Sequence, residues 1–193
     1  TYRSGAKEND LLVVTGDLGA AYLGLQLLKR EKDMFIDNPT IQPDLTGNDY
    51  VLERQLKPEA AVKYIKILKE LKIVPTCMID ISDGLSVDLQ HICNQSNLGF
   101  KIFEDKIPIK KESKITAKEL GLDTTICALH GGEDYELLFT VPISQHSKIN
   151  KLEDCTIIGH TTSNNKDKQL ITSSGAQVDL EKEGWDSFVR SNI

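Results

Sequence analysis

The chain has 193 residues, a length that suits one domain of ordinary size with some additional residues. Its content of 39% hydrophobic and 27% charged residues is that of a globular protein and excludes an intrinsically disordered chain. The formal net charge of -6 argues against a general nucleic-acid binder. No apolar run reaches the roughly 18 residues that a membrane span needs. We therefore expect no nucleic-acid partner and no membrane.

The start of the chain and its cysteines indicate where the protein resides. The chain begins with Thr1, and residues 1–7 lack the apolar core of a signal peptide, so we expect a start inside a longer or processed protein. The four cysteines form no C-x-x-C pair, which argues against a zinc site. Their apolar neighbours predict reduced core thiols, and we expect a cytoplasmic protein.

The first half of the chain shows alternating strand and helix patterns. Residues 10–15 predict a buried strand that ends at Gly16, and residues 19–30 have the apolar spacing of a helix. Residues 33–50 are rich in Pro, Gly, Asp and Asn and predict a loop. A helix is predicted to begin at Pro58. The residues of its expected apolar face are Ala61, Ile65, Leu68 and Leu71.

The second half continues the alternation. Strands are predicted at 76–81, 100–103, 136–141, 155–159 and 169–172, with a polar turn at 163–167. Helices are predicted at 85–96 and 113–121, and Ser144 is predicted to cap a further, short helix. Strands that alternate with helices favour an α/β fold.

The segment 80–85, with the sequence DISDGL, is the most informative part of the chain. Strand alternation places Asp80 on the same face as Ser82, and Asp83 follows in the turn before the next helix. Such oxygen ligands suit magnesium, and free N–H groups at a helix start suit phosphate. The alternative is that Asp83 only caps the helix while Asp80 pairs with a lysine.

Two further segments have the composition of ligand sites. Residues 131–137, GGEDYEL, combine twin glycines, which let the backbone approach a ligand, with three acids. A plain turn with solvated acids is the alternative. Trp185, the only tryptophan, could stack on a flat heteroaromatic ligand or simply dock the chain end onto the domain. The glycine pair in residues 16–19 lacks the remaining residues of a P-loop and predicts a packing turn.

Taken together, these segments resemble the thiamine-monophosphate kinase family over nearly the whole chain. The matching segments, in order, are 3–7, 14–16, 19–25, 80–85, 131–137, 158–159 and 184–188. The first acidic motif is shared in part with aminoimidazole ribonucleotide synthetase and selenophosphate synthetase, whereas GGEDYEL and the terminal GW-x-x-F point to the thiamine branch. The resemblance implies a three-layer α/β domain with a mixed, mostly antiparallel sheet.

The resemblance also implies an activity and a set of site residues. The family transfers the ATP γ-phosphoryl group to thiamine monophosphate with the help of Mg²⁺, by direct in-line transfer. The implied roles in this chain are magnesium binding by Asp80 and Asp83, ATP binding by Arg3 and Ser82, and substrate binding by Glu133 and Trp185. Trp185 would stack on the thiamine part, and Glu133 would accept hydrogen bonds from its aminopyrimidine.

The chain departs from the family pattern in two respects. The family's N-terminal domain, which carries most magnesium aspartates and builds a homodimer, is absent, so we expect this chain alone to be inactive. Lys57 precedes Pro58 where the family has an arginine, which leaves the conformation of residues 33–57 open. The alternatives are a related ATP-dependent enzyme of the same superfamily with another substrate, and a non-catalytic ligand-binding module.

Overall fold

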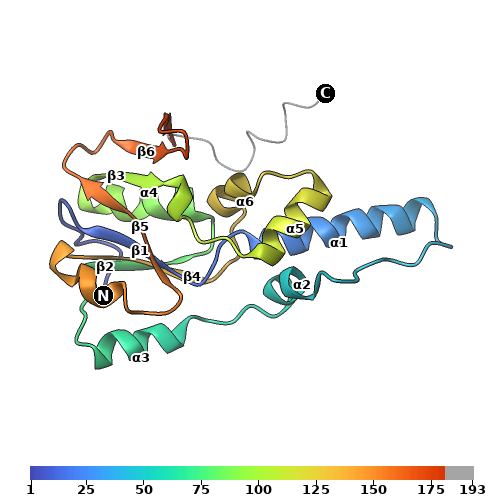
Figure 1. Ribbon diagram of the computed structural model, residues 1–193, viewed down its shortest axis with the longest axis horizontal. Coiled ribbons are helices and arrows are strands. Elements are labelled where there is room, and N and C mark those ends of the chain that lie inside the picture. The colour runs from blue at the N-terminus through green and yellow to red at the C-terminus, as the bar shows by residue number, and fades with distance from the viewer. Residues whose placement is uncertain (181–193) are drawn as a thin grey trace.

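A computed structural model describes residues 1–180 and shows a sheet with helices on both faces (Figure 1). Within these residues the sheet has seven strands in the order β2-β4-β1-β5-β3-β6-β7. The strands are β1 (Leu11–Thr15), β2 (Cys77–Ile81), β3 (Gly99–Phe103), β4 (Glu136–Val141), β5 (Cys155–Thr162), β6 (Lys168–Ile171) and β7 (Gln177–Asp179). Every pair of neighbours is antiparallel except β3 and β6. The predicted mixed, mostly antiparallel sheet is therefore confirmed.

Helices connect most of the strands. The α-helices are α1 (Ala20–Asp37), α2 (Asp49–Leu56), α3 (Val62–Glu70), α4 (Leu85–Ser96), α5 (Lys111–Leu120), α6 (Thr124–His130) and α7 (His146–Ile149). Two 3-10 turns, η1 (Glu104–Lys106) and η2 (Ile143–Gln145), lie between them. The predicted bounds of β4 and α4 agree with the structure to the residue, because both segments have an uninterrupted apolar pattern and a glycine near their start.

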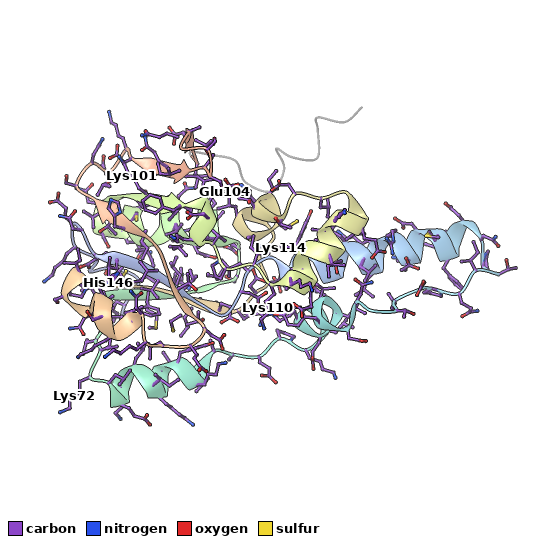
Figure 2. The ribbon with its side chains drawn as sticks, in the orientation of Figure 1. Lys72, Lys101, Glu104, Lys110, Lys114 and His146 are labelled. Atoms are coloured by element: carbon purple, nitrogen blue, oxygen red, sulfur yellow. The ribbon has the colours of Figure 1, made fainter. Side chains whose placement is uncertain are left out.

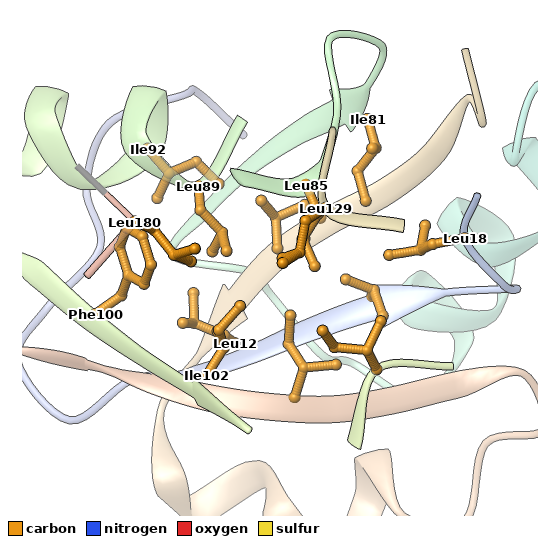
Figure 3. Close-up of a cluster of buried hydrophobic side chains, with 14 of the residues drawn as sticks. Leu12, Leu18, Ile81, Leu85, Leu89, Ile92, Phe100, Ile102, Leu129 and Leu180 are labelled. Atoms are coloured by element: carbon orange, nitrogen blue, oxygen red, sulfur yellow. The ribbon is translucent and has the colours of Figure 1, made fainter. Parts of the chain in front are cut away.

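The centre of the sheet is β1, which is buried along its whole length. Leu12 and Val14 point into a core beneath α4 and α6, which includes Leu89 and Phe100 (Figure 3). Leu11 and Val13 point to the opposite face and contact a second core. Because both faces are covered, β1 has a continuous apolar run instead of an alternating one.

The second core lies between the sheet and the helices α3 and α7. Tyr64 and Leu68 of α3 and Ile149 of α7 are buried there. The helices α4 and α6 cover one face and α3 and α7 the other, as Figure 1 shows for α4 and α3. The predicted three-layer α/β arrangement is thus confirmed. The expected apolar face of α3 was partly wrong, since Ile65 and Leu71 are exposed.

A third apolar cluster joins α1, α2 and α5 beside the sheet. Leu23 and Leu27 of α1 contact Val51 of α2 and Ala117 of α5. In Figure 1 these helices extend from one end of the sheet, and α1 is the longest of them. Gly24 permits the close approach of α1 and α2, because a Cβ atom there would lie 2.2 Å from the Val51 carbonyl oxygen. The cluster holds α2 at the end of the sheet where the candidate site lies.

The loop predicted for residues 33–50 and the helix predicted at Pro58 were wrong in their bounds. The helix α1 continues to Asp37, residues 49–56 form α2, and α3 begins only at Val62. The short elements α6 and β7 were missed, and Ser144 lies inside η2 instead of capping a helix. The helix α2 begins inside the segment predicted as a loop, and the packing of Val51 against α1 stabilises it.

The structure also bears on the state of the cysteines and on membrane spans. All four cysteines are buried and free of disulfides, as predicted. Over residues 1–180, no helix combines the length and the apolar character required to cross a membrane.

Candidate functional site

The edge of the sheet positions Arg3 and Asp80. Within residues 1–180, the strand β2 has only β4 as a strand neighbour, and on its open side the Met78 amide donates to the Tyr2 carbonyl at 2.9 Å. The N-terminal segment therefore follows β2 and places the Arg3 guanidinium 4.0 Å from the Asp80 carboxylate. Both side chains are about half exposed, at 58% and 49%. Asp80 is thus exposed, and its observed partner is an arginine, not the lysine of the alternative.

The turn after β2 is organised by Asp88, a residue that the sequence analysis did not single out. Asp88 lies in the first turn of α4, and its Oδ2 accepts hydrogen bonds from the Ser82 and Asp83 amides at 3.1 and 3.2 Å. Gly84 occupies the N-cap position of α4 without a side-chain cap. The alternative that Asp83 serves as the helix cap is therefore wrong. Its exposed carboxylate is available for another partner.

Three donor atoms gather where α4 begins. A carboxylate oxygen of Asp83, one of Asp88 and a ring nitrogen of His91 lie within 4.8 Å of one another. Burial raises the pKa of Asp88 to about 6, and the Asp83 amide counteracts part of that rise. Two carboxylates and an imidazole form a donor set that fits a divalent cation.

The segment 131–136 contacts this turn through its backbone. The Glu133 amide donates to the Ser82 carbonyl at 2.8 Å, and the Tyr135 amide donates to the Ile81 carbonyl at 2.9 Å. Glu133 and Tyr135 both have left-handed backbone conformations, with φ of 62° and 52°, which non-glycine residues rarely adopt. The two motifs that the sequence singled out are therefore adjacent, and the loop is held in a strained conformation as ligand sites often are.

Three of the predicted site residues line one pocket of about 560 Å³. They are Ser82, Asp83 and Glu133, and the wall is completed by Leu25, Gln55, Val87 and Gly131. Asp80 lines a neighbouring, more apolar pocket of about 380 Å³ between α3 and the sheet. Tyr135 also lines this second pocket, and its hydroxyl donates to Glu133 at 2.8 Å. Asp80 and Ser82 thus line different pockets, although strand alternation placed them on the same face.

Two of the three acids in GGEDYEL are buried, which contradicts the alternative of a solvated turn. The Asp134 carboxylate accepts hydrogen bonds from the amides of Gly19, at 2.8 Å, and Ala21, at 3.5 Å, at the start of α1. The Glu136 carboxylate accepts from the Thr15 hydroxyl at 2.6 Å. These bonds attach the loop to β1 and α1.

Arg54 of α2 connects the buried acids. Its Nη2 lies 3.2 Å from the Glu136 carboxylate and donates to the Asp134 carbonyl at 3.0 Å. The pair is mostly buried, with side-chain exposures of 18% for Arg54 and 10% for Glu136. Because a charge-assisted bond in such surroundings is stronger than one in water, Arg54 fixes α2 against the loop.

A second set of contacts holds α2 from the side of Asp17. The Tyr50 hydroxyl donates a short hydrogen bond to the buried Asp17 carboxylate, and burial together with this bond raises the pKa of Tyr50. The Lys110 ammonium, labelled in Figure 2 near the start of α5, lies 4.7 Å from the Tyr50 ring centroid and 4.0 Å from Asp17. The turn 16–19 is therefore a packing turn, as predicted, and its aspartate also anchors α2.

The buried Asp134 predicts a pH-dependent stability. Burial raises its pKa from 3.8 to about 7, against the lowering effects of the Gly19 amide and Arg54. The folded protein then binds more protons than the unfolded chain between about pH 4 and pH 7, so stability falls as the pH rises through this range. We expect wild type, relative to Asp134→Asn, to lose more than about 1 kcal/mol between pH 4.5 and 7.5.

Urea unfolding at several pH values measures this loss. The exposed Asp105→Asn is the control. Its free energy of unfolding, plotted against pH, should run parallel to that of wild type. Parallel curves for Asp134→Asn and wild type would mean that Asp134 remains charged on folding.

The sequence did not reveal the buried contacts around the pocket. The roles of Asp17, Arg54, Asp88 and Asp134 were not predicted, because the contacts of each form only in the folded chain. Lys57 is exposed and lines a different pocket together with Arg54. Trp185 lies outside the described residues, and the ligand roles of all six predicted site residues stay predictions.

Comparison with known proteins agrees with the resemblance. The thiamine-monophosphate kinase of Buchnera aphidicola subsp. Schizaphis graminum is 36% identical over 97% of this chain and 55% of its own length. That of Aquifex aeolicus is 32% identical over 96% of this chain and 54% of its own length. This chain spans about half the length of these curated relatives.

A solved structure gives the same result for the fold. The structure described as AaThiL complexed with AMPPCP and TMP superposes with a TM-score of 0.75 and 30% identity, over 95% of this chain and 52% of that one. The family model for the AIR synthase related protein, C-terminal domain, matches residues 7–170 and includes both motif segments. On the strength of this match and the fold, the chain belongs to the AIR synthase related protein family, as a C-terminal domain.

Proposed function

We propose that this chain is the C-terminal part of a kinase that transfers the γ-phosphoryl group of ATP to thiamine monophosphate and forms thiamine diphosphate. The observation that carries the proposal is the single pocket lined by Ser82, Asp83 and Glu133. It joins a candidate phosphate and metal site to a candidate site for the acceptor's ring. The names of the curated relatives support the same activity, as do the ATP analogue and TMP in the AaThiL complex.

The proposed roles follow from position and charge. Arg3, on the exposed edge of β2, would bind a phosphate of ATP through its planar guanidinium. Ser82 would donate to another phosphate oxygen near the uncapped start of α4, where the helix dipole favours negative charge. Glu133 would accept from the aminopyrimidine of the acceptor, and Trp185 would stack on its thiamine part.

Asp80 and Asp83 are proposed to hold magnesium. Both carboxylates are exposed, and the described residues provide neither with a lysine partner. Hard oxygen ligands of this kind fit Mg²⁺, which when bound would neutralise phosphate charge. In the proposed in-line transfer, an oxygen of the acceptor's phosphate forms the new bond to the γ-phosphorus while the bond to the β–γ bridging oxygen breaks and ADP leaves. Positioning and charge neutralisation would supply the rate.

The test uses the full-length protein that contains this chain. Wild type is expected to form thiamine diphosphate and ADP in equal amounts from ATP and thiamine monophosphate, as measured by chromatography. Asp83→Asn should lower kcat/KM at least about tenfold and raise the Mg²⁺ concentration required, because one metal ligand is weakened. The exposed Asp105→Asn serves as the control and should behave as wild type.

Three outcomes would contradict the proposal. Normal turnover and normal Mg²⁺ dependence in both Asp80→Asn and Asp83→Asn would remove the metal assignment. Phosphorylation of another small acceptor in place of thiamine monophosphate would favour a related enzyme of the superfamily. The absence of transfer to any acceptor would favour a ligand-binding module.

A further inference from the structure

Gln55, which lines the pocket of about 560 Å³ described above, has a hydrogen-bonding group without a partner among the described residues. Gln55 lines the pocket with Ser82, Asp83 and Glu133, yet its amide oxygen is buried without a hydrogen-bond partner among the described residues. A buried polar atom without a partner costs free energy, so such an atom at a ligand pocket points to a bond that forms only with the ligand. Gln145 and Gln169 have similarly unpartnered oxygens, but neither lines this pocket.

The base of the Gln55 side chain is fixed by its surroundings. A Cβ atom on Gly24 would lie 2.9 Å from the Gln55 Cβ, which shows how closely α1 approaches this residue. The preceding residue, Arg54, is held by Glu136 and by the Asp134 carbonyl. The carboxamide is therefore the part that can turn, and turning it breaks no hydrogen bond of its oxygen. A group with a fixed base and a free end is well suited to respond to a ligand.

The chemistry of a carboxamide selects a particular kind of ligand edge. It offers one acceptor oxygen and an NH₂ donor side by side, and Gln pairs in this way with the amino group and adjacent ring nitrogen of adenine. The aminopyrimidine of thiamine monophosphate presents the same combination of amino donor and neighbouring ring-nitrogen acceptor. Leu25 and Val87 supply apolar walls for the faces of such a ring.

We propose that Gln55 pairs with the aminopyrimidine edge of thiamine monophosphate and is a specificity-determining residue of the acceptor pocket. This inference rests on the proposed function and assigns Gln55 to the same site. Glu133 lines the same pocket and provides a second acceptor for the exocyclic amino group. Selection then depends on the amino group, because replacing it by a hydrogen atom removes the donor that both side chains require.

The experiment compares two acceptors in the full-length protein. One is thiamine monophosphate, and the other is its deamino analogue, in which a hydrogen atom replaces the amino group. Gln55→Leu keeps a similar volume but removes the hydrogen bonds. We expect it to lower kcat/KM for thiamine monophosphate about tenfold, with a change of less than about threefold for the deamino analogue and for the KM of ATP.

The control is Gln169→Leu, which removes an equally unpartnered oxygen in β6, away from the pocket. It should leave both acceptors and ATP unchanged. A thermal melt of each variant monitors folding, and Gln55→Leu should melt no lower than wild type because it removes an unsatisfied polar atom.

Equal losses for the two acceptors, or equal behaviour of Gln55→Leu and Gln169→Leu, would overturn the assignment of Gln55 while wild-type turnover upholds the kinase. A wild-type protein that forms no thiamine diphosphate would overturn both the proposed function and this inference.

Discussion

Replacement of Arg54 by alanine is expected to lower the free energy of unfolding by about 3 kcal/mol or more, because it leaves buried acids without their cation. The Arg54 guanidinium pairs with Glu136 at 3.2 Å and donates to the Asp134 carbonyl, and the pair is largely shielded from water. Without it, the Glu136 carboxylate keeps only the Thr15 hydroxyl as a hydrogen-bonding partner among these contacts. Urea unfolding measures the change.

Arg3→Ala is the matched control for this prediction. The pair of Arg3 with Asp80 is also an arginine–carboxylate pair, but its atoms are 4.0 Å apart and both side chains are about half exposed. Exposed pairs contribute at most about 1 kcal/mol, so Arg3→Ala should unfold almost as wild type does. If the two variants lost similar stability, burial of the Arg54 pair would not be what stabilises this end of the sheet.

Gly132→Ala is expected to destabilise the protein by about 3 kcal/mol, from a strained backbone and a clash together. Gly132 has φ of 68°, and a Cβ atom there would lie 2.6 Å from the Ser82 carbonyl oxygen. That oxygen cannot move freely, because it accepts the hydrogen bond from the Glu133 amide. The methyl group would therefore separate the two segments that line the shared pocket.

Gly121→Ala is the control that measures how much of this destabilisation comes from backbone strain alone. Gly121 ends α5 with nearly the same φ, 69°, but nothing lies within 4 Å of the Cβ position. Its replacement should cost only about 1 kcal/mol. Denaturant unfolding of both variants gives the difference, which is the cost of the clash. Equal losses would mean that the loop at Gly132 yields easily, and that its close approach to Ser82 does not fix the pocket.

Local pattern predicted the main elements because burial on one or two faces leaves a period in the sequence. The strand β1 was recognised from its unbroken apolar run, and α5 was expected to end at Gly121, as it does. The helix α2 was missed because its stability comes from Val51 against α1 and from Arg54 against distant acids. The strand β7 has three exposed residues and hence no apolar pattern to detect.

The candidate site, too, could be predicted only in part from the sequence. The sequence indicated Asp80, Asp83 and Glu133 as acids near glycine turns, and the family resemblance supplied their expected ligands. It could not distinguish exposed Glu133 from buried Asp134, because the partners of Asp134 are the Gly19 and Ala21 amides at the start of α1. The exposure of Asp80 likewise became clear only in the structure, where β2 is an edge strand of the sheet within residues 1–180.

The sequence by itself determined the fold class, the order of most elements and the two motifs, because each can be recognised from the spacing of residues that are close together in the chain. The tertiary structure alone decided which acids are buried, that Arg54 pairs with Glu136, and that Gln55 joins Ser82 and Glu133 in one pocket. The reason is physical. Burial and charge pairing depend on residues that are far apart along the chain, and only the packed sheet and helices bring them within bonding distance.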